Sequence, residues 1–124
     1  LCALSAFWVG VLYDQSSLDA AWDLVKGWSA AERDKLRHDV PKLALKAEIQ
    51  GRSVRDVARD VLAIARRGLD ARHQLGCKGK SEASFLDVLD ETVASGKTAA
   101  DRLLDLYHAE WKGDISRVFR DFAF

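Results

Sequence analysis

Three histidines, two cysteines and a cluster of acidic residues are the side chains of this 124-residue sequence whose types suit catalysis or metal binding. His73 and Cys77 stand four residues apart, a spacing that can place two ligands on one face of a helix. Zinc sites use at least three protein ligands, so this pair alone does not make one. The other histidines, His38 and His108, fall in different predicted helices. We therefore predict no metal site, and we interpret His73 and Cys77 as a helix end that runs into a loop.

Asp87, Asp90 and Glu91 are carboxylates close enough in sequence to suggest Mg²⁺. Hard cations need oxygen ligands that converge from several directions, whereas these three project from the outer face of one predicted helix. We therefore interpret them as solvent-exposed. A glycine-rich phosphate loop, a G-x-S-x-G elbow, an H-E-x-x-H motif and paired CxxC motifs are all missing from the sequence. The sequence thus predicts no catalytic residue and no cofactor bound by this chain.

Basic and acidic side chains balance in this sequence, with 19 Lys and Arg against 19 Asp and Glu. No long-range field attracts phosphates or anionic lipids, so we predict neither a nucleic-acid partner nor a membrane partner. The densest basic stretch lies among acidic residues at helical intervals, which predicts a solvated face carrying ion pairs. Its basic members are Arg66, Arg67, Arg72 and His73, and the acidic ones are Asp56, Asp60 and Asp70.

The longest apolar run lies within residues 1–13, which is too short to span a bilayer and has no preceding basic segment to make a signal peptide. Cys2 and Cys77 are too few for a disulfide framework, so a reducing compartment is the default. We therefore expect a cytoplasmic protein. The sequence also starts at Leu1 and lacks Met, from which we expect that processing or truncation has removed an upstream part.

Capping residues and glycines divide the chain into stretches of helical periodicity. The sequence predicts an all-α or nearly all-α fold, with five to six packed amphipathic helices in a single domain over residues 1–124. The helices are predicted at about 3–13, from Ser16 or Ser17 to near Gly27, from a Ser29–Glu32 capping box to just before Pro41, from Ser53 through Leu69, from Ser84 to Gly96, and from Thr98 to Gly113.

Three further features refine this outline. Gly10, within the first helix, predicts close packing against another element. Residues 43–50 alternate between apolar and polar types, which permits one short strand or an extended connection. The bulky apolar residues of the tail, 115–124, predict that it docks onto the body of the domain.

The opening segment carries a specific resemblance. Residues 1–14 read LCALSAFWVGVLYD and resemble the segment LCALPAFWVGLLYD of plant-type glutamate-cysteine ligases, a family shared by plants and many proteobacteria. The similarity continues in order: residues 28–33 resemble the family's W-T-x-x-E-R, residues 36–41 its L-R-x-x-V-P, and residues 96–104 its G-x-T-P-A-E-x-L-L. Ser5 and Ala99 stand where the family has proline. The resemblance covers the whole chain.

The resemblance implies a role within a larger enzyme, because in this family the matching stretch is the C-terminal part and follows the active site. The parent would use ATP and Mg²⁺ to activate the γ-carboxylate of glutamate as an acyl phosphate, which the amine of cysteine attacks in the first step of glutathione biosynthesis. Such chemistry needs metal-binding carboxylates and cationic phosphate clamps held together. This sequence does not supply that set, so we expect the isolated chain to be inactive and its partner to be the N-terminal catalytic region of the same enzyme.

The first helix is apolar nearly all round, which is more than a lone domain can bury. We expect Phe7, Trp8 and Val11 to pack against the catalytic region, and the isolated chain to self-associate through this helix or to be marginally stable. Cys2 aligns with a cysteine that plant members can place in a regulatory disulfide. The alternative interpretation of Cys2 is a small residue on a packed helix, since Cys77 sits in a distant loop. The alternative function is a stand-alone helical interaction domain derived from this family.

Overall fold

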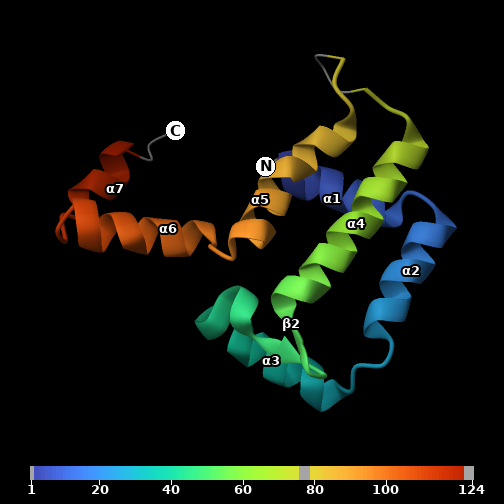
Figure 1. Ribbon diagram of the computed structural model, residues 1–124, viewed down its shortest axis with the longest axis horizontal. Coiled ribbons are helices and arrows are strands. Elements are labelled where there is room, and N and C mark those ends of the chain that lie inside the picture. Colours follow the sequence, from blue (N-terminus) through green and yellow to red (C-terminus); the bar gives the residue numbers. More distant parts are fainter. Residues whose placement is uncertain (1, 76–78, 122–124) are drawn as a thin grey trace.

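The computed structural model describes residues 2–75 and 79–121 and is nearly all helical (Figure 1). The α-helices are α1 Cys2–Leu12, α2 Gln15–Val25, α3 Ala30–Leu43, α4 Val54–Arg72, α5 Asp87–Ser95, α6 Ala99–Asp105 and α7 Ser116–Asp121. Short 3₁₀ segments, η1 Ala44–Lys46 and η2 Glu82–Leu86, precede β1 and α5, and a π-helical segment, η3 Leu106–Glu110, follows α6. The predicted fold class is confirmed, and the tail adds the short helix α7.

Local signals set most of the helix ends. Ser29 and Glu32 form the predicted capping box at α3, Ser53 caps α4, and Gly96 ends α5 with a left-handed φ of 70°. Thr98 opens α6 with a second capping box, in which its hydroxyl accepts from the backbone N–H of Asp101. These predictions are confirmed. They could be made from the sequence because each cap depends on groups within four residues of one another.

Three predicted helix ends are wrong. Asp14, and neither Ser16 nor Ser17, caps α2, because its carboxylate accepts the Ser17 N–H at 2.7 Å. Helical structure before α5 begins three residues early, as η2, because Ser81 provides the cap in place of Ser84. Helix α3 continues through Pro41 to Leu43, since proline removes one N–H donor but leaves the Val40 carbonyl free to accept from Ala44.

Residues 43–50, predicted as a short strand or an extended connection, are extended only in part. Residues 44–46 form the 3₁₀ turn η1, and β1 (Glu48–Ile49) pairs antiparallel with β2 (Arg52–Ser53). Glu48 lies opposite Ser53 in this ribbon. Ile49 is only 4% exposed, so the ribbon turns one apolar side chain inward and leads directly into α4.

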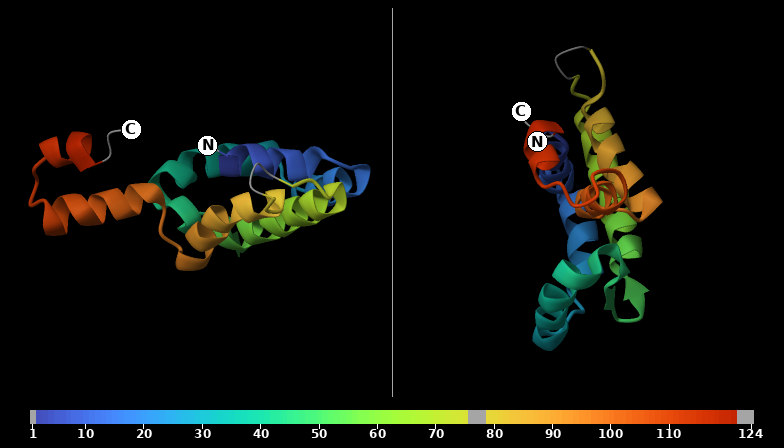
Figure 2. Two further views of the ribbon diagram at one scale, coloured as in Figure 1. Left: turned by 90° about the horizontal axis from the view of Figure 1, so that it is seen from above. Right: turned by 90° about the vertical axis from the view of Figure 1, so that its left-hand side faces the viewer.

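The body of the molecule is built by α1 crossing the long helix α4, with α2, η2 and α5 beside them (Figure 2). The helices cross at Gly10 and Gly68, where the two backbones approach so closely that neither position has room for a Cβ. The close packing predicted at Gly10 is therefore confirmed. The buried core at this crossing consists of Ala6, Val11, Ala65, Leu69, Ala83 and Leu86.

The C-terminal part forms an arm that projects from the body (Figures 1 and 2). For residues 115–121 this contradicts the prediction that the tail docks there, and the rest of the predicted tail lies outside the described residues. We use the term arm for residues 98–121, which comprise α6, η3 and α7. Lys112 and Gly113 both adopt left-handed φ values, 47° and 86°, and reverse the chain at the far end of the arm. Helix α7 thus folds back beside the far end of α6, and its Phe119 is 76% exposed (Figure 1).

Candidate functional site

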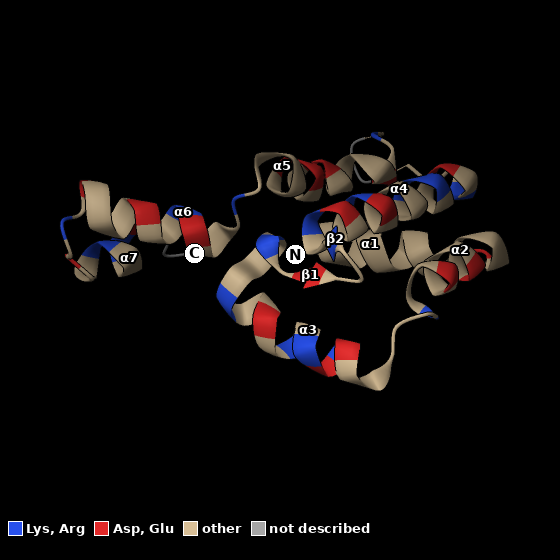
Figure 3. Ribbon diagram, turned by 60° about the horizontal axis from the view of Figure 1, so that its bottom comes forward, with Lys and Arg blue, Asp and Glu red and all other residues tan. Residues whose placement is uncertain are grey.

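One face of α1 is apolar and open to solvent. Leu4, Trp8 and Leu12 are 61%, 53% and 58% exposed. Phe7 is half-buried and meets Trp8 edge to face, with ring centroids 5.3 Å apart. Helix α1 carries no charged residue, whereas both signs of charge are spread over α3 and α4 (Figure 3). An uncharged apolar surface of this kind is typical of a face that packs against another protein element.

Val11 does not belong to this exposed face. It is 5% exposed and lies in the core at the crossing with α4. Its predicted role in packing against another region is therefore wrong, because the tight approach of α1 to α4 at the adjacent Gly10 turns Val11 inward. For Phe7 and Trp8 that role stays a prediction.

Cys2 is the first residue of α1 and is an exposed free thiol. Helix α1 packs against α4, so the interpretation of Cys2 as a small residue on a packed helix stays open. His73 is the C-terminal cap of α4, which agrees with the predicted helix end, and Cys77 lies outside the described residues. The redox role of Cys2 stays a prediction.

Of the three acidic residues of α5 predicted to be solvent-exposed, Asp87 and Glu91 are exposed and Asp90 is half-buried. Glu91 accepts from Arg102 of α6, whereas Asp87 and Asp90 pair with α4. The guanidinium of Arg66 donates to Asp90 and, at 3.0 Å, to Asp87. These two carboxylates, Asp90 above all, raise the pKa of Arg66. One arginine on α4 thus pairs with two carboxylates of α5, so this cluster links the two helices and is not arranged to bind a cation.

A second arginine of α4 joins the same two helices. Arg55 donates its Nε–H to the carbonyl oxygen of Val93 at 2.7 Å, and its guanidinium also reaches the carbonyl of Ala94. These carbonyls lie at the end of α5, where the helix itself offers them no N–H partner. Arg55 therefore serves as a C-terminal cap of α5 supplied by another helix.

The three histidines lie far apart in the sequence and in different elements: His38 in α3, His73 at the C-terminal cap of α4, and His108 in η3. Over residues 2–75 and 79–121, no three His, Cys, Asp or Glu side chains are grouped so that they could hold a metal ion. In the same described part of the chain, every helix is too short or too polar to cross a membrane.

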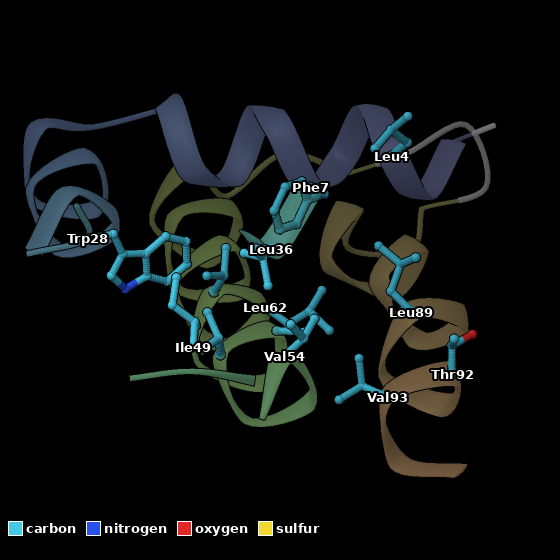
Figure 4. A pocket seen from close by; sticks show the side chains of 13 residues that line it. Leu4, Phe7, Trp28, Leu36, Ile49, Val54, Leu62, Leu89, Thr92 and Val93 are labelled. Atoms are coloured by element: carbon cyan, nitrogen blue, oxygen red, sulfur yellow. The ribbon is translucent and has the colours of Figure 1, made fainter. Parts of the chain in front are cut away.

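An apolar groove lies between α1, α3, α4 and α5 (Figure 4). Phe7 projects into it from α1, while Leu89 and Val93 face it from α5. Its volume is about 370 Å³, and its exposed lining is wholly apolar. The remaining lining residues are Leu4, Trp28, Leu36, Ile49, Val54, Val57, Ala58, Val61, Leu62 and Thr92. We refer to this feature below as the apolar groove.

Comparison with known proteins adds evidence independent of this geometry. The sequence model of the family described as Glutamate-cysteine ligase family 2 (GCS2) matches residues 1–121. The chain is 44% identical over 124 residues to the chloroplastic glutamate-cysteine ligase of Arabidopsis thaliana, and 41% to that of Solanum lycopersicum. This chain belongs to glutamate-cysteine ligase family 2. The match covers all of the chain but only 23% of each of these two relatives.

Ligase A of Oryza sativa subsp. indica is 40% identical over the same 124 residues, which are 24% of its length. The chain thus spans about a quarter of the length of these relatives. All three are named as chloroplastic, which contradicts the cytoplasmic location expected from the sequence. Cysteine usage indicates a reducing compartment but does not distinguish one such compartment from another.

The apolar groove was not predicted from the sequence. Its lining comes from separate elements whose apolar positions each look like ordinary core residues. Leu36 of α3 lines the groove although α3 has no fully buried residue. Nothing in the sequence around Leu36 distinguishes it from an ordinary core residue.

Proposed function

We propose that this chain is the C-terminal helical part of an ATP-dependent glutamate-cysteine ligase. The observation that carries the proposal is the family match over residues 1–121 together with 44% identity to the Arabidopsis thaliana ligase. The parent would form γ-glutamylcysteine from glutamate and cysteine, and this helical part would support its active-site region. The single domain over residues 1–124 would then be one unit of a polypeptide about four times as long, as in the relatives.

ATP and Mg²⁺ would be bound by other parts of the parent. The residues that the structure describes do not fit Mg²⁺, because no three of their His, Cys, Asp and Glu side chains are grouped so that they could hold a metal ion, and Asp87 and Asp90 are paired with Arg66. We therefore derive no step through ATP or Mg²⁺ on this chain. The isolated 124 residues are expected to have no ligase activity and no ATPase activity.

The test is to read the uninterrupted coding sequence that contains these residues and to express its product. The expected product forms γ-glutamylcysteine only with ATP and Mg²⁺ present, while the 124-residue chain alone gives no turnover. Activity of the purified short chain that survives removal of contaminating ligase would overturn the assignment of catalysis to other parts. An inactive full product would overturn the ligase function.

The contact with the catalytic region would use the exposed face of α1. Trp8 and Leu12 are more than half exposed, and burying a large side chain contributes roughly 2 to 3 kcal/mol. In the isolated chain the same face would promote self-association. This part of the proposal is supported by the lack of charge on α1.

A second candidate function is a stand-alone helical interaction domain derived from the family. The observation that favours it is the same exposed face of α1, which would suit a separate protein partner. The coding sequence separates the candidates: an in-frame continuation into several hundred residues with the active-site motifs excludes the stand-alone domain, and a nearby start codon supports it.

A plastid location is the proposal that agrees with the names of the relatives. Imaging the full product fused to a fluorescent protein in plant cells tests it. Signal that coincides with chlorophyll autofluorescence is the expected result, and diffuse cytosolic signal would contradict it.

A further inference from the structure

The apolar groove is a second apolar surface of the molecule, next to the exposed face of α1. It lies between α1, α4 and α5 on the body, with Leu36 of α3 and Trp28 near its end (Figure 4). Small-molecule sites combine an apolar lining with a few polar groups that orient the ligand. The groove exposes no polar surface in its lining. It is therefore suited to apolar side chains and not to an amino acid, a nucleotide or another polar ligand.

The lining also restricts the backbone that can lie over the groove. A peptide group buried there without a hydrogen-bond partner would cost a few kcal/mol, and the surface that the groove exposes is wholly apolar, with the Thr92 hydroxyl already donating to the carbonyl of Val88. An extended segment would leave half of its peptide groups facing these walls. A helix satisfies its backbone internally and can present apolar side chains at i, i+3 and i+4. The occupant that meets both conditions is an amphipathic helix.

We propose that the apolar groove receives an amphipathic helix from a part of the ligase polypeptide outside these 124 residues. This inference rests on the proposed function. Its support is the length of that polypeptide, since the 124 residues make up only 23% of the Arabidopsis thaliana relative. The groove adjoins the exposed face of α1 through Leu4, so both surfaces would be covered together.

The arm of a second copy is a less suitable occupant. Its exposed apolar side chains, Leu104, Ile115 and Phe119, lie on α6, on the loop and on α7 respectively. They do not form a stripe on one helix. A covering helix from the same polypeptide also needs no second molecule, because its effective concentration is set by the connecting chain.

Photo-crosslinking in the full-length product tests the proposal. Leu36→p-benzoylphenylalanine places the reactive group at the groove on α3, a helix with no fully buried residue, so the change is compatible with folding. The matched control is Ala31→p-benzoylphenylalanine, an exposed position on the same helix outside the groove. After irradiation, peptide mapping identifies the partner.

The expected result is an intramolecular crosslink from position 36 to an amphipathic helix outside these 124 residues, with a yield several-fold above that from position 31. A covalent dimer would overturn the proposal in favour of a second copy, and equal low yields at both positions would show an uncovered groove. A crosslink to a segment that is not helical would also overturn it. Ligase activity of the same preparations is read separately: an active product without the crosslink refutes only this inference, and a crosslinked but inactive product refutes only the ligase function.

Discussion

The crossing of α1 and α4 has no room for a side chain at Gly10. A Cβ built there would lie 2.7 Å from the carbonyl carbon of Ala65 and closer still to its oxygen. At Gly68 the same atom would lie 2.9 Å from the carbonyl carbon of Gly10. Both obstacles are backbone atoms, so no side-chain rotation can relieve the overlap. Gly10→Ala must therefore push the two helices apart by about 1 Å, which is the kind of overpacking that destabilises a core.

The size of the effect follows from what the crossing holds together. Separating the helices loosens Ala6 and Val11 of α1 from Ala65 and Leu69 of α4, which form the main core cluster. Overpacking typically destabilises by about 1 to 3 kcal/mol, and we place this site at the upper end because backbone must move. A loss of about 3 kcal/mol is a large part of the roughly 5 to 15 kcal/mol that stabilises a domain. For a chain of this size it lowers the Tm by about 10 °C.

Urea and thermal unfolding, followed by circular dichroism and by tryptophan fluorescence, measure this loss. The matched control is Gly27→Ala, because a Cβ at Gly27 meets nothing within 4 Å and the backbone there does not have a left-handed φ. The control should unfold within about 0.5 kcal/mol of the parent chain. If Gly10→Ala unfolds at the same urea concentration and temperature as Gly27→Ala, the close approach of α1 to α4 is not as described.

Three further results are expected. Ser53→Ala should destabilise the chain by about 1 kcal/mol at neutral pH through loss of the α4 cap. The Ser53 hydroxyl also donates to the Asp56 carboxylate and lowers the pKa of Asp56 below its ordinary value, so the stability from this bond is present above the ordinary pKa and lost as pH falls through the lowered pKa. The gap between the urea midpoints of parent and variant should therefore narrow in acid to the part that the pH-independent cap contributes, and a gap that stays constant with pH would contradict this. Arg55→Met should leave the Val93 carbonyl unpaired, cost about 1 to 3 kcal/mol and speed amide exchange at the end of α5, whereas unchanged exchange would show that the cap is dispensable. Trp8→Gln should weaken self-association in sedimentation velocity while leaving stability within about 0.5 kcal/mol, and a parent chain that is monomeric at all concentrations would refute the role of the α1 face.

The sequence by itself determined the local structure. The capping boxes at Ser29–Glu32 and Thr98–Asp101 and the end of α5 at Gly96 were predictable, because each depends on a few neighbouring residues and on backbone geometry. The helical class followed from periodicity, and family membership followed from motifs that extend along the whole chain. The errors at Asp14 and Pro41 arose where two local signals competed within one turn.

Only the tertiary structure decided which apolar and charged groups meet. Val11 and Trp8 lie on the same uncharged helix, yet Val11 is 5% exposed and Trp8 is 53% exposed. The close approach of α4 at Gly10 determines which side of α1 is buried. Arg66 could have paired with acidic residues on its own helix, but it binds Asp87 and Asp90 of α5. The apolar groove likewise exists only where α1, α3, α4 and α5 come together. Periodicity identifies an apolar stripe, whereas the angle and distance between helices determine what covers it.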